Sequence, residues 1–214
     1  MFEKVLSKDA KNTLGLLGKS GLLDFAYLAG GTALALQLNH RYSYDSDFFT
    51  PKKFDERILV QRFAELSSNF ELERKDWGTI LGYFGETRFS LFFYKYPLLF
   101  KTHKFLDINV ADIKDIAAMK IAAIADRGTK RDFIDLYFIF NEAKIITLEE
   151  SLKLYDKKFK ALPQNKIHIL KSLVYFEDAD RNKSPKMIKL VSWSKVKEFF
   201  VNEQERLTKK LLSF

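Results

Sequence analysis

The stretch LAGGTALALQLNHRYSYDSDFF, residues 28–49, decides the fold. It continues an apolar segment, residues 25–29, whose composition is typical of a short buried strand. A glycine pair, Gly30-Gly31, comes next, and the Ala- and Leu-rich residues 32–39 predict a helix after it. Residues 44–49 alternate acidic with aromatic or small side chains, which is the period of a strand with one solvated face. The stretch therefore predicts strand, glycine turn, helix and strand.

Two carboxylates, Asp45 and Asp47, lie in the second of these strands. At this spacing both side chains leave a strand on the same side. Hard divalent cations such as Mg²⁺ prefer oxygen ligands, so the pair is suited to metal-dependent phosphate chemistry. The alternative is an ordinary solvated strand face, where acidic pairs at this spacing are common.

The glycine turn favours the metal interpretation over the solvated face. Backbone N–H groups at the start of a helix can hold phosphates, and Thr32 would add a hydroxyl there. The alternative is that Gly30 and Gly31 only make a tight turn. The turn and the carboxylates together form a rarer pattern than either one alone.

The rest of the chain predicts a mixed core followed by helices. Helical patterns occur at residues 9–23, 55–66, 112–127, 131–141 and 194–212, and strand patterns at 70–74, 80–84, 87–94 and 105–110, with Gly85-Glu86 as a hairpin turn. After residue 143 only helical patterns occur, broken near residue 163 and from 178 to 185. The predicted class is α+β, with a core over residues 1–143 and a helical C-terminal region over 144–214.

Composition excludes several kinds of site. The chain has 214 residues and no cysteine, which rules out disulfides, thiolate zinc sites and cysteine nucleophiles. Its three histidines are scattered rather than set at zinc-ligand spacing. No signal-peptide pattern opens the chain and no apolar run reaches the roughly 18 to 20 residues that span a bilayer. We therefore expect a cytoplasmic protein with no membrane partner.

The charge of the chain fits an anionic partner and, equally, an ordinary solvated basic surface. The formal net charge is +8, which would attract nucleic acid, nucleotides or other anionic surfaces. The lysines of the C-terminal region are candidates to hold RNA, the alternative being a solvated helical face. They are Lys157, Lys158, Lys160, Lys166, Lys183, Lys186, Lys189, Lys195 and Lys197.

The ordered motifs resemble those of a known family. A Gly-Gly pair, a spacer and Asp-x-Asp are the signature of the polymerase-beta-like nucleotidyltransferases, and the sequence is similar in particular to the AbiEii group of toxin nucleotidyltransferases. Residues 28–36 and 41–49 carry the first two motifs, and residues 115–120 and 130–137 carry two later ones. The resemblance covers residues 25–140 and implies a polymerase-beta-like core, a mixed sheet flanked by helices.

The resemblance also implies roles for single residues. Ser43 and the turn Gly30-Gly31-Thr32 would contact a nucleoside triphosphate, and Asp45 and Asp47 would hold Mg²⁺. Lys120 and Asp132 correspond to further active-site positions, with Lys120 as a point charge on a phosphate.

Several of these candidates have a second interpretation. Lys120 could instead be a surface lysine that extends its ammonium into water. Asp135 could position Lys120 or Arg131, or only cap and solvate its helix. Arg88, on the strand predicted over residues 87–94, could reach a phosphate or pair with Glu86.

One position departs from the family pattern. Many enzymes of the superfamily carry a third acidic residue on a later strand, where this sequence has Ser90. Asp107 or Asp132 could take its place, or the site could hold one ion less tightly.

The resemblance implies transfer of a nucleoside monophosphate from a nucleoside triphosphate to RNA, tRNA in the first place, by a toxin that a partner antitoxin restrains. Two alternatives stay open: the same chemistry on a small hydroxylated molecule, and a non-catalytic nucleotide- or RNA-binding module. The sequence does not identify the base.

Overall fold

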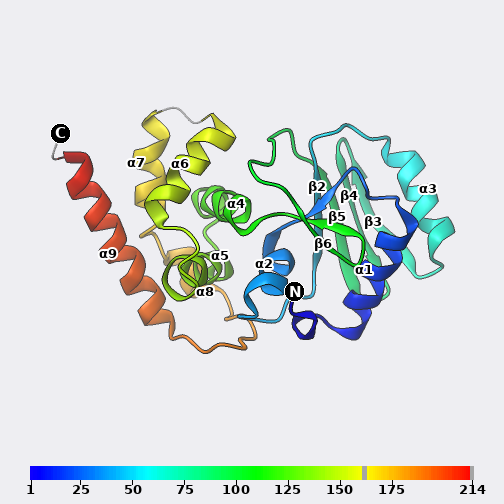
Figure 1. The fold of residues 1–214 in the computed structure, drawn as a ribbon, viewed down its shortest axis with the longest axis horizontal. Helices are drawn as coiled ribbons and strands as arrows, with labels where there is room; N and C mark the ends of the chain where they lie inside the picture. Colours follow the sequence, from blue (N-terminus) through cyan, green and yellow to red (C-terminus); the bar gives the residue numbers. More distant parts are fainter. Residues whose placement is uncertain (161–162, 213–214) are drawn as a thin grey trace. The chain divides into compact units, whose positions relative to one another are not determined.

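The alternation of strand and helix signals in the first half of the chain produces a mixed sheet, and the second half is helical (Figure 1). The computed structural model describes residues 1–160 and 163–212. It divides into two units, Met1–Asp112 and Ile113–Phe214. This agrees with the predicted α+β class. The boundary predicted between residues 143 and 144 falls inside the second unit, and as a division into domains it stays a prediction.

The seven strands of the first unit form one sheet with the order β3-β4-β5-β2-β1-β7-β6. They are β1 (Tyr27–Leu28), β2 (Ser46–Thr50), β3 (Phe70–Asp76), β4 (Thr79–Phe84), β5 (Thr87–Phe93), β6 (His103–Phe105) and β7 (Ile108–Val110). β2 runs parallel to β5 and antiparallel to β1, while β1 and β7 are parallel. The sheet is therefore mixed, with β2 near its middle.

Alternation along β2 separates a core face from a more open face. Ser46, Phe48 and Thr50 are buried, whereas Asp47 and Phe49 are half-buried. Phe48 packs against Phe89 of β5, with ring centroids 5.7 Å apart. The period-2 pattern of the sequence thus directs Asp47 away from this aromatic core.

Four helical segments complete the first unit: η1 (Glu3–Val5), α1 (Lys8–Ser20), α2 (Gly30–Leu38) and α3 (Glu56–Leu66). Ser7 caps α1 by accepting a hydrogen bond from the N–H of Ala10. Phe63 of α3 packs edge-on against Phe89, with centroids 5.2 Å apart, so α3 covers the core face of the sheet.

The strand predicted over residues 105–110 is wrong in one respect. The segment is the end of a hairpin, β6 and β7, because Leu106 and Asp107 adopt left-handed φ angles of 48° and 63°. Asp adopts that conformation more readily than most residues but Leu does not, so Leu-Asp without a glycine or asparagine is a weak turn signal.

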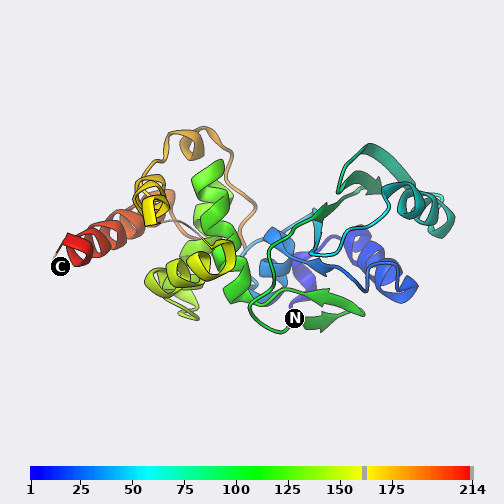
Figure 2. The ribbon, with the colours of Figure 1, turned by 90° about the horizontal axis from the view of Figure 1, so that it is seen from above.

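The second unit consists of α4 (Ile113–Asp126), α5 (Lys130–Tyr137), the π-helix η2 (Phe138–Glu142), α6 (Leu148–Phe159), α7 (Pro163–Ser172), α8 (Glu177–Arg181) and α9 (Trp193–Leu212), the last drawn in red in Figure 2. Phe133 of α5 contacts the rings of Phe176, Trp193 and Phe200. The break predicted from residue 178 to 185 is partly wrong, since α8 occupies its start.

In the described part of the chain, no helix is both long and apolar enough to cross a membrane.

Candidate active site

The turn from β1 into α2 fits closely around one carboxylate. Gly30 has a left-handed φ of 65°, and a Cβ atom placed there would lie 3.2 Å from Oδ2 of Asp47. The N–H of Ala29 donates to the Asp47 carbonyl oxygen at 3.0 Å, which ties the turn to β2. Glycine is therefore needed at position 30 for its backbone conformation and for the close approach of Asp47.

The two predicted carboxylates lie at the start of β2. Asp45 directly precedes the strand and Asp47 is its second residue. Both are half-buried, while Ser46 between them is buried, which is the alternation expected if the two carboxylates share a side. The pair is accessible and offers only oxygen atoms, so its chemistry fits a divalent cation such as Mg²⁺.

The hydroxyls of Thr32 and Ser43 hold the loop that carries Asp45. Thr32 Oγ1 hydrogen-bonds with Ser43 Oγ at 2.8 Å and with the carbonyl oxygen of Asp45. Both side chains are buried. The structure thus gives them a positioning role, and their predicted contact with a triphosphate stays a prediction.

Arg41 is a feature of this loop that the sequence analysis missed. Its side chain is only 4% exposed, and its Nη1 donates to the carbonyl oxygen of Tyr42 at 3.0 Å. A Cβ atom at Gly31 would overlap its Nη2. The second glycine of the pair therefore makes room for a guanidinium, which places a fixed positive charge on the loop before Asp45. An arginine between a glycine pair and Asp-x-Asp was the available signal.

β5 places two more candidates beside β2. Ser90 is the register partner of Asp47, so the position where a third carboxylate was expected is adjacent to the pair but holds a hydroxyl. Arg88 is exposed, and its Nη2 lies 3.5 Å from a carboxylate oxygen of Glu73. Its ion pair is thus with β3 rather than with Glu86.

Within the first unit, the described residues bring no third carboxylate to the pair. Asp107 lies in the turn between β6 and β7, and within residues 1–160 and 163–212 no group of three or more acidic or histidine side chains is arranged to hold a metal ion. The first unit therefore offers two carboxylates to a cation.

The second unit brings three of the other predicted residues together. Lys120 Nζ lies 2.7 Å from Oδ1 of Asp132 and 2.7 Å from Oδ2 of Asp135. The exposed fractions are 6%, 1% and 0%. The interpretation of Lys120 as a surface lysine is therefore wrong, and Asp135 pairs with Lys120. Arg131 is exposed on α5.

Two residues that the sequence analysis missed complete this cluster. Thr129 Oγ1 donates to Oδ2 of Asp132 at 2.7 Å, and Arg127 Nε lies 3.3 Å from the same oxygen. Thr129 is the N-cap residue of α5 and Asp132 is three positions on. The spacing Thr-x-x-Asp at a helix start was a readable signal for the first of these contacts.

Electrostatics keep Asp132 ionised. Burial alone would raise the pKa of its carboxyl, but the charges of Lys120 and Arg127 and the hydrogen bonds from Lys120 and Thr129 outweigh burial and lower that pKa below 3.8. The cluster therefore places the Lys120 side chain between Asp135 and the ionised Asp132.

One lysine proposed to contact RNA is unavailable. Lys158 of α6 is fully buried, and its Nζ lies 2.9 Å from Oδ1 of Asp115 on α4. That expectation was wrong because the lysine neutralises a carboxylate inside the helical unit. The side chain of Lys166 lies outside the described residues. Lys157, Lys160, Lys183, Lys186, Lys189 and Lys195 are exposed, and Lys197 is half-buried.

Comparisons with known proteins identify the family and the fold of the chain. A family model described as nucleotidyl transferase AbiEii toxin, type IV TA system, matches residues 84–208. An uncharacterized protein of Aquifex aeolicus (strain VF5) is 40% identical over 200 residues, which cover 91% of this chain and 94% of that protein. The matched family region includes Lys120, Asp132 and Asp135, whereas Asp45 and Asp47 precede it.

Two crystal structures from Helicobacter pylori have a similar fold. One, described as a candidate nucleotidyltransferase, superimposes with a TM-score of 0.52 at 18% identity and covers 97% of this chain and 98% of its own. The other, JHP933, gives a TM-score of 0.51 at 18% identity, with the same coverage. The fold is thus the mixed α/β fold of these structures, and by its family match the chain belongs to the AbiEii nucleotidyl transferase toxin family and is a nucleotidyltransferase.

Proposed function

We propose that this nucleotidyltransferase moves a nucleoside monophosphate from a nucleoside triphosphate to an RNA acceptor, tRNA in the first place, and that Asp45 and Asp47 hold the Mg²⁺ it requires. The observation that carries the proposal is the pair of half-buried carboxylates at the start of β2, Asp45 just before the strand and Asp47 within it, with Gly30 directly against Asp47. This geometry suits the joint binding of a cation and of the phosphates it accompanies.

The residues of the first unit have separate tasks in this proposal. When bound, Mg²⁺ would supply Lewis-acid stabilisation of charge on the transferring phosphate. Asp45 and Asp47 hold it, Thr32 and Ser43 keep the Asp45 loop in place, and Arg41 stabilises the loop beside Gly31. Arg88 is a candidate phosphate ligand, since its exchange from Glu73 to a phosphate costs little at an exposed position.

Lys120 is the proposed cation of the second unit. Its two carboxylate partners, Asp132 and Asp135, fix the direction of its ammonium, and a positioned lysine can act as a point charge on a phosphate. Asp132, ionised by its surroundings, is the further acidic candidate. Arg131 and Asp135 are supporting residues in this scheme.

The proposed acceptor follows from charge. The net charge of +8 and the exposed lysines of the C-terminal region favour a polyanion over a cationic small molecule. The name of the family includes a toxin–antitoxin system, so we also propose a cognate antitoxin protein as a partner.

The test is transfer of label. The purified protein is incubated with each labelled nucleoside triphosphate, Mg²⁺ and total tRNA, and Asp45→Ala is compared with wild type. Asp24→Ala serves as the matched control, because Asp24 is exposed in the same unit and has no part in the site. We expect label in RNA from wild type and control only, and the labelled triphosphate that works identifies the base.

Other results would favour the other functions. An Asp45→Ala variant that keeps full activity would contradict the metal assignment. Consumption of triphosphate without labelled RNA would favour a small hydroxylated acceptor. Binding without turnover would favour a non-catalytic module, for which Ser90 beside Asp47 is the structural argument.

A further inference from the structure

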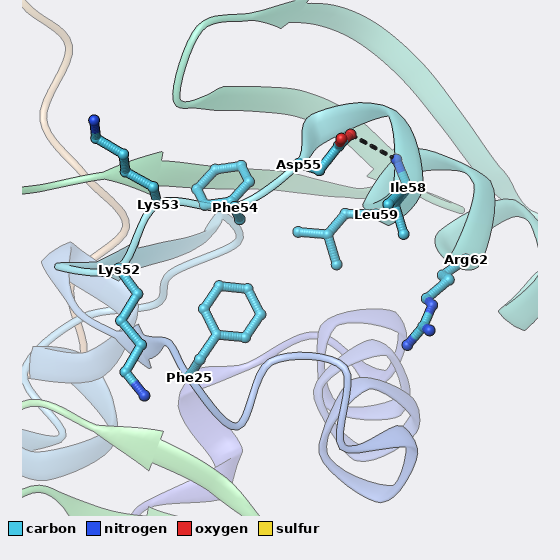
Figure 3. A pocket seen from close by; sticks show the side chains of 8 residues that line it. All are labelled: Phe25, Lys52, Lys53, Phe54, Asp55, Ile58, Leu59 and Arg62. Atoms are coloured by element: carbon cyan, nitrogen blue, oxygen red, sulfur yellow. Dashed lines mark hydrogen bonds between the residues drawn. The ribbon is translucent and has the colours of Figure 1, made fainter.

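The first unit contains a pocket that the proposed active site does not use. It has a volume of about 350 Å³ and lies where the chain passes from β2 into α3. Figure 3 shows the residues that line it: Phe25, Lys52, Lys53, Phe54, Asp55, Ile58, Leu59 and Arg62.

The walls of the pocket are aromatic and aliphatic. The rings of Phe25 and Phe54 have centroids 6.2 Å apart and are tilted by 48°, and both rings and Leu59 face the hollow (Figure 3). Ile58 is 54% exposed, although it is a large apolar residue. Phe25 and Phe54 are half-buried and Leu59 is buried, so the pocket is a partly open apolar hollow of the kind that marks a binding site.

The edge of the pocket is positively charged. Lys52, Lys53 and Arg62 are all exposed. The single carboxylate, Asp55, caps α3: its Oδ1 accepts from the N–H groups of Arg57 at 2.9 Å and Ile58 at 3.1 Å. The negative charge of Asp55 is therefore compensated by the positive N-terminal end of the α3 dipole. The three basic side chains then leave the pocket with a net positive charge.

The walls are held in place before any ligand binds. Thr50 Oγ1 donates to the carbonyl oxygen of Phe25 at 2.9 Å and accepts from the N–H of Lys52 at 3.1 Å. At the other side, Glu56 in the first turn of α3 accepts from the N–H of Gly78 at 2.6 Å. A ligand therefore meets backbone walls that are already ordered, and the ordering that opposes binding is that of the exposed Lys52, Lys53 and Arg62 side chains.

We propose that this pocket binds a nucleotide of single-stranded RNA, with the base against Phe25 and Phe54 and the flanking phosphates at Lys52, Lys53 and Arg62. Aromatic rings stack with any base, and a basic groove follows the backbone, which together bind single strands without sequence preference. The inference rests on the proposed function, for which it supplies a contact to the acceptor away from the reacting end.

The pocket is close in the sequence to the carboxylates of the proposed active site, which fits a contact between the pocket and the RNA acceptor. Lys52 is five residues after Asp47, so the two Cα atoms are at most about 18 Å apart. That span corresponds to a few nucleotides of extended RNA, and because Asp47 points away from the face that α3 covers, the RNA would pass around the end of β2 between the pocket and the carboxylates. An apolar side chain of an acidic protein segment is the competing occupant, and the paired rings favour a base over it.

The test measures binding without turnover. Anisotropy of a fluorescent, unstructured single-stranded RNA of about 12 nucleotides, a length within the usual site sizes, is recorded with the full chain in the absence of triphosphate. Phe25→Leu/Phe54→Leu keeps the pocket apolar but removes stacking. Lys52→Gln/Lys53→Gln/Arg62→Gln removes its charge, and Lys4→Gln/Lys8→Gln/Lys75→Gln removes equal charge from exposed sites elsewhere in the unit.

We expect the double leucine variant to bind RNA at least about five-fold more weakly. The pocket charge variant should lower the slope of log affinity against log salt by about 2, since each lost phosphate contact contributes about 0.7. The control triple variant should lower it less. Crosslinks from 4-thiouridine in the RNA should map to the pocket peptides.

Failure of the inference is distinct from failure of the proposed function. Unchanged RNA affinity in both pocket variants, with label transfer by wild type intact, would overturn the pocket and leave the function standing. If the wild-type protein binds RNA through the pocket but transfers no label, the pocket stands and the proposed function is overturned. A pocket that binds an acidic peptide and excludes RNA would assign it to a protein partner and overturn the inference.

Discussion

Residue 30 shows how a single missing side chain shapes the candidate site. A Cβ atom at this position would lie only 3.2 Å from Oδ2 of Asp47, and the backbone has a φ of 65°. The sequence predicted the glycine turn and the carboxylates, because both have local signatures. It did not predict Arg41 against Gly31 or the Thr32–Ser43 hydrogen bond, since these contacts depend on how the loop folds back over α2.

Replacing Gly30 by alanine should reduce activity beyond its effect on stability. The left-handed conformation costs a residue with a Cβ about 1–2 kcal/mol, and the new methyl group, 3.2 Å from Oδ2 of Asp47, crowds that carboxylate and forces it to shift. Gly21→Ala is the matched control, because its φ of 68° is almost the same and its Cβ would meet Asp24 at an ordinary 3.4 Å. We expect both variants to lose similar stability in denaturant unfolding, and only Gly30→Ala to lose label transfer. Equal activity in the two variants would contradict the role of Gly30.

Asp132 gives the second unit an acid-sensitive contact. Because its pKa is lowered in the folded state, the native carboxylate stays charged where the unfolded one takes up a proton. Its contribution to stability is therefore complete above the unfolded pKa, near 3.8, and is lost as the pH falls through the lower folded value. Asp132→Asn cannot titrate, and we expect it to cost about 1.5–3 kcal/mol at neutral pH.

The measurement is the difference in unfolding free energy between wild type and Asp132→Asn as a function of pH, followed by helical circular dichroism. It should be constant at neutral pH and shrink below pH 3.8. Asp126→Asn, at an exposed position on α4, should show little difference at any pH. If the difference in unfolding free energy grew as the pH fell, the lowered pKa of Asp132 could not be its cause.

At the scale of elements, local periodicity predicted most of the helices and strands. The helix signal at residues 55–66 and the strand signal at 87–94 correspond to α3 and β5 within one residue or two. The β6–β7 turn and the π-helix η2 were not predicted, since neither has a local residue signature. The parallel pairing of β2 with β5 joins segments about forty residues apart, so its register, and with it Ser90 beside Asp47, is fixed only by the assembled sheet.

The buried ion pair between α4 and α6 should be costly to break from one side. Lys158→Met leaves the carboxylate of Asp115 buried without its cation, which costs about 3–5 kcal/mol. Asp115→Leu/Lys158→Met replaces both charges by apolar side chains and should recover most of that loss. Denaturant unfolding of the two variants checks this. If the double variant is no more stable than Lys158→Met, the lost stability is not due to the uncompensated charge of Asp115, and this prediction is wrong.

At the scale of the whole chain, the position of the boundary between units decides which fragments fold. The sheet and its helices lie within residues 1–112. Residues 113–143 contain α4, α5 and η2, but the partners of Phe133 come from α9 and the segment before α8. A fragment that ends at residue 143 therefore keeps Phe133 and loses Phe176, Trp193 and Phe200.

We expect fragment 1–112 to fold alone and fragment 1–143 to carry an unfolded extension. Loss of the aromatic partners exposes a ring that is fully buried in the complete chain, and a truncated large apolar contact costs about 3–5 kcal/mol, which α4 and α5 cannot offset by themselves. Limited proteolysis with mass spectrometry should therefore cut 1–143 back to near residue 112 while it leaves 1–112 intact. If residues 113–143 resist the protease as well as residues 1–112 do, the folded core extends to residue 143. The domain boundary would then lie between residues 143 and 144, where the change in sequence pattern predicts it.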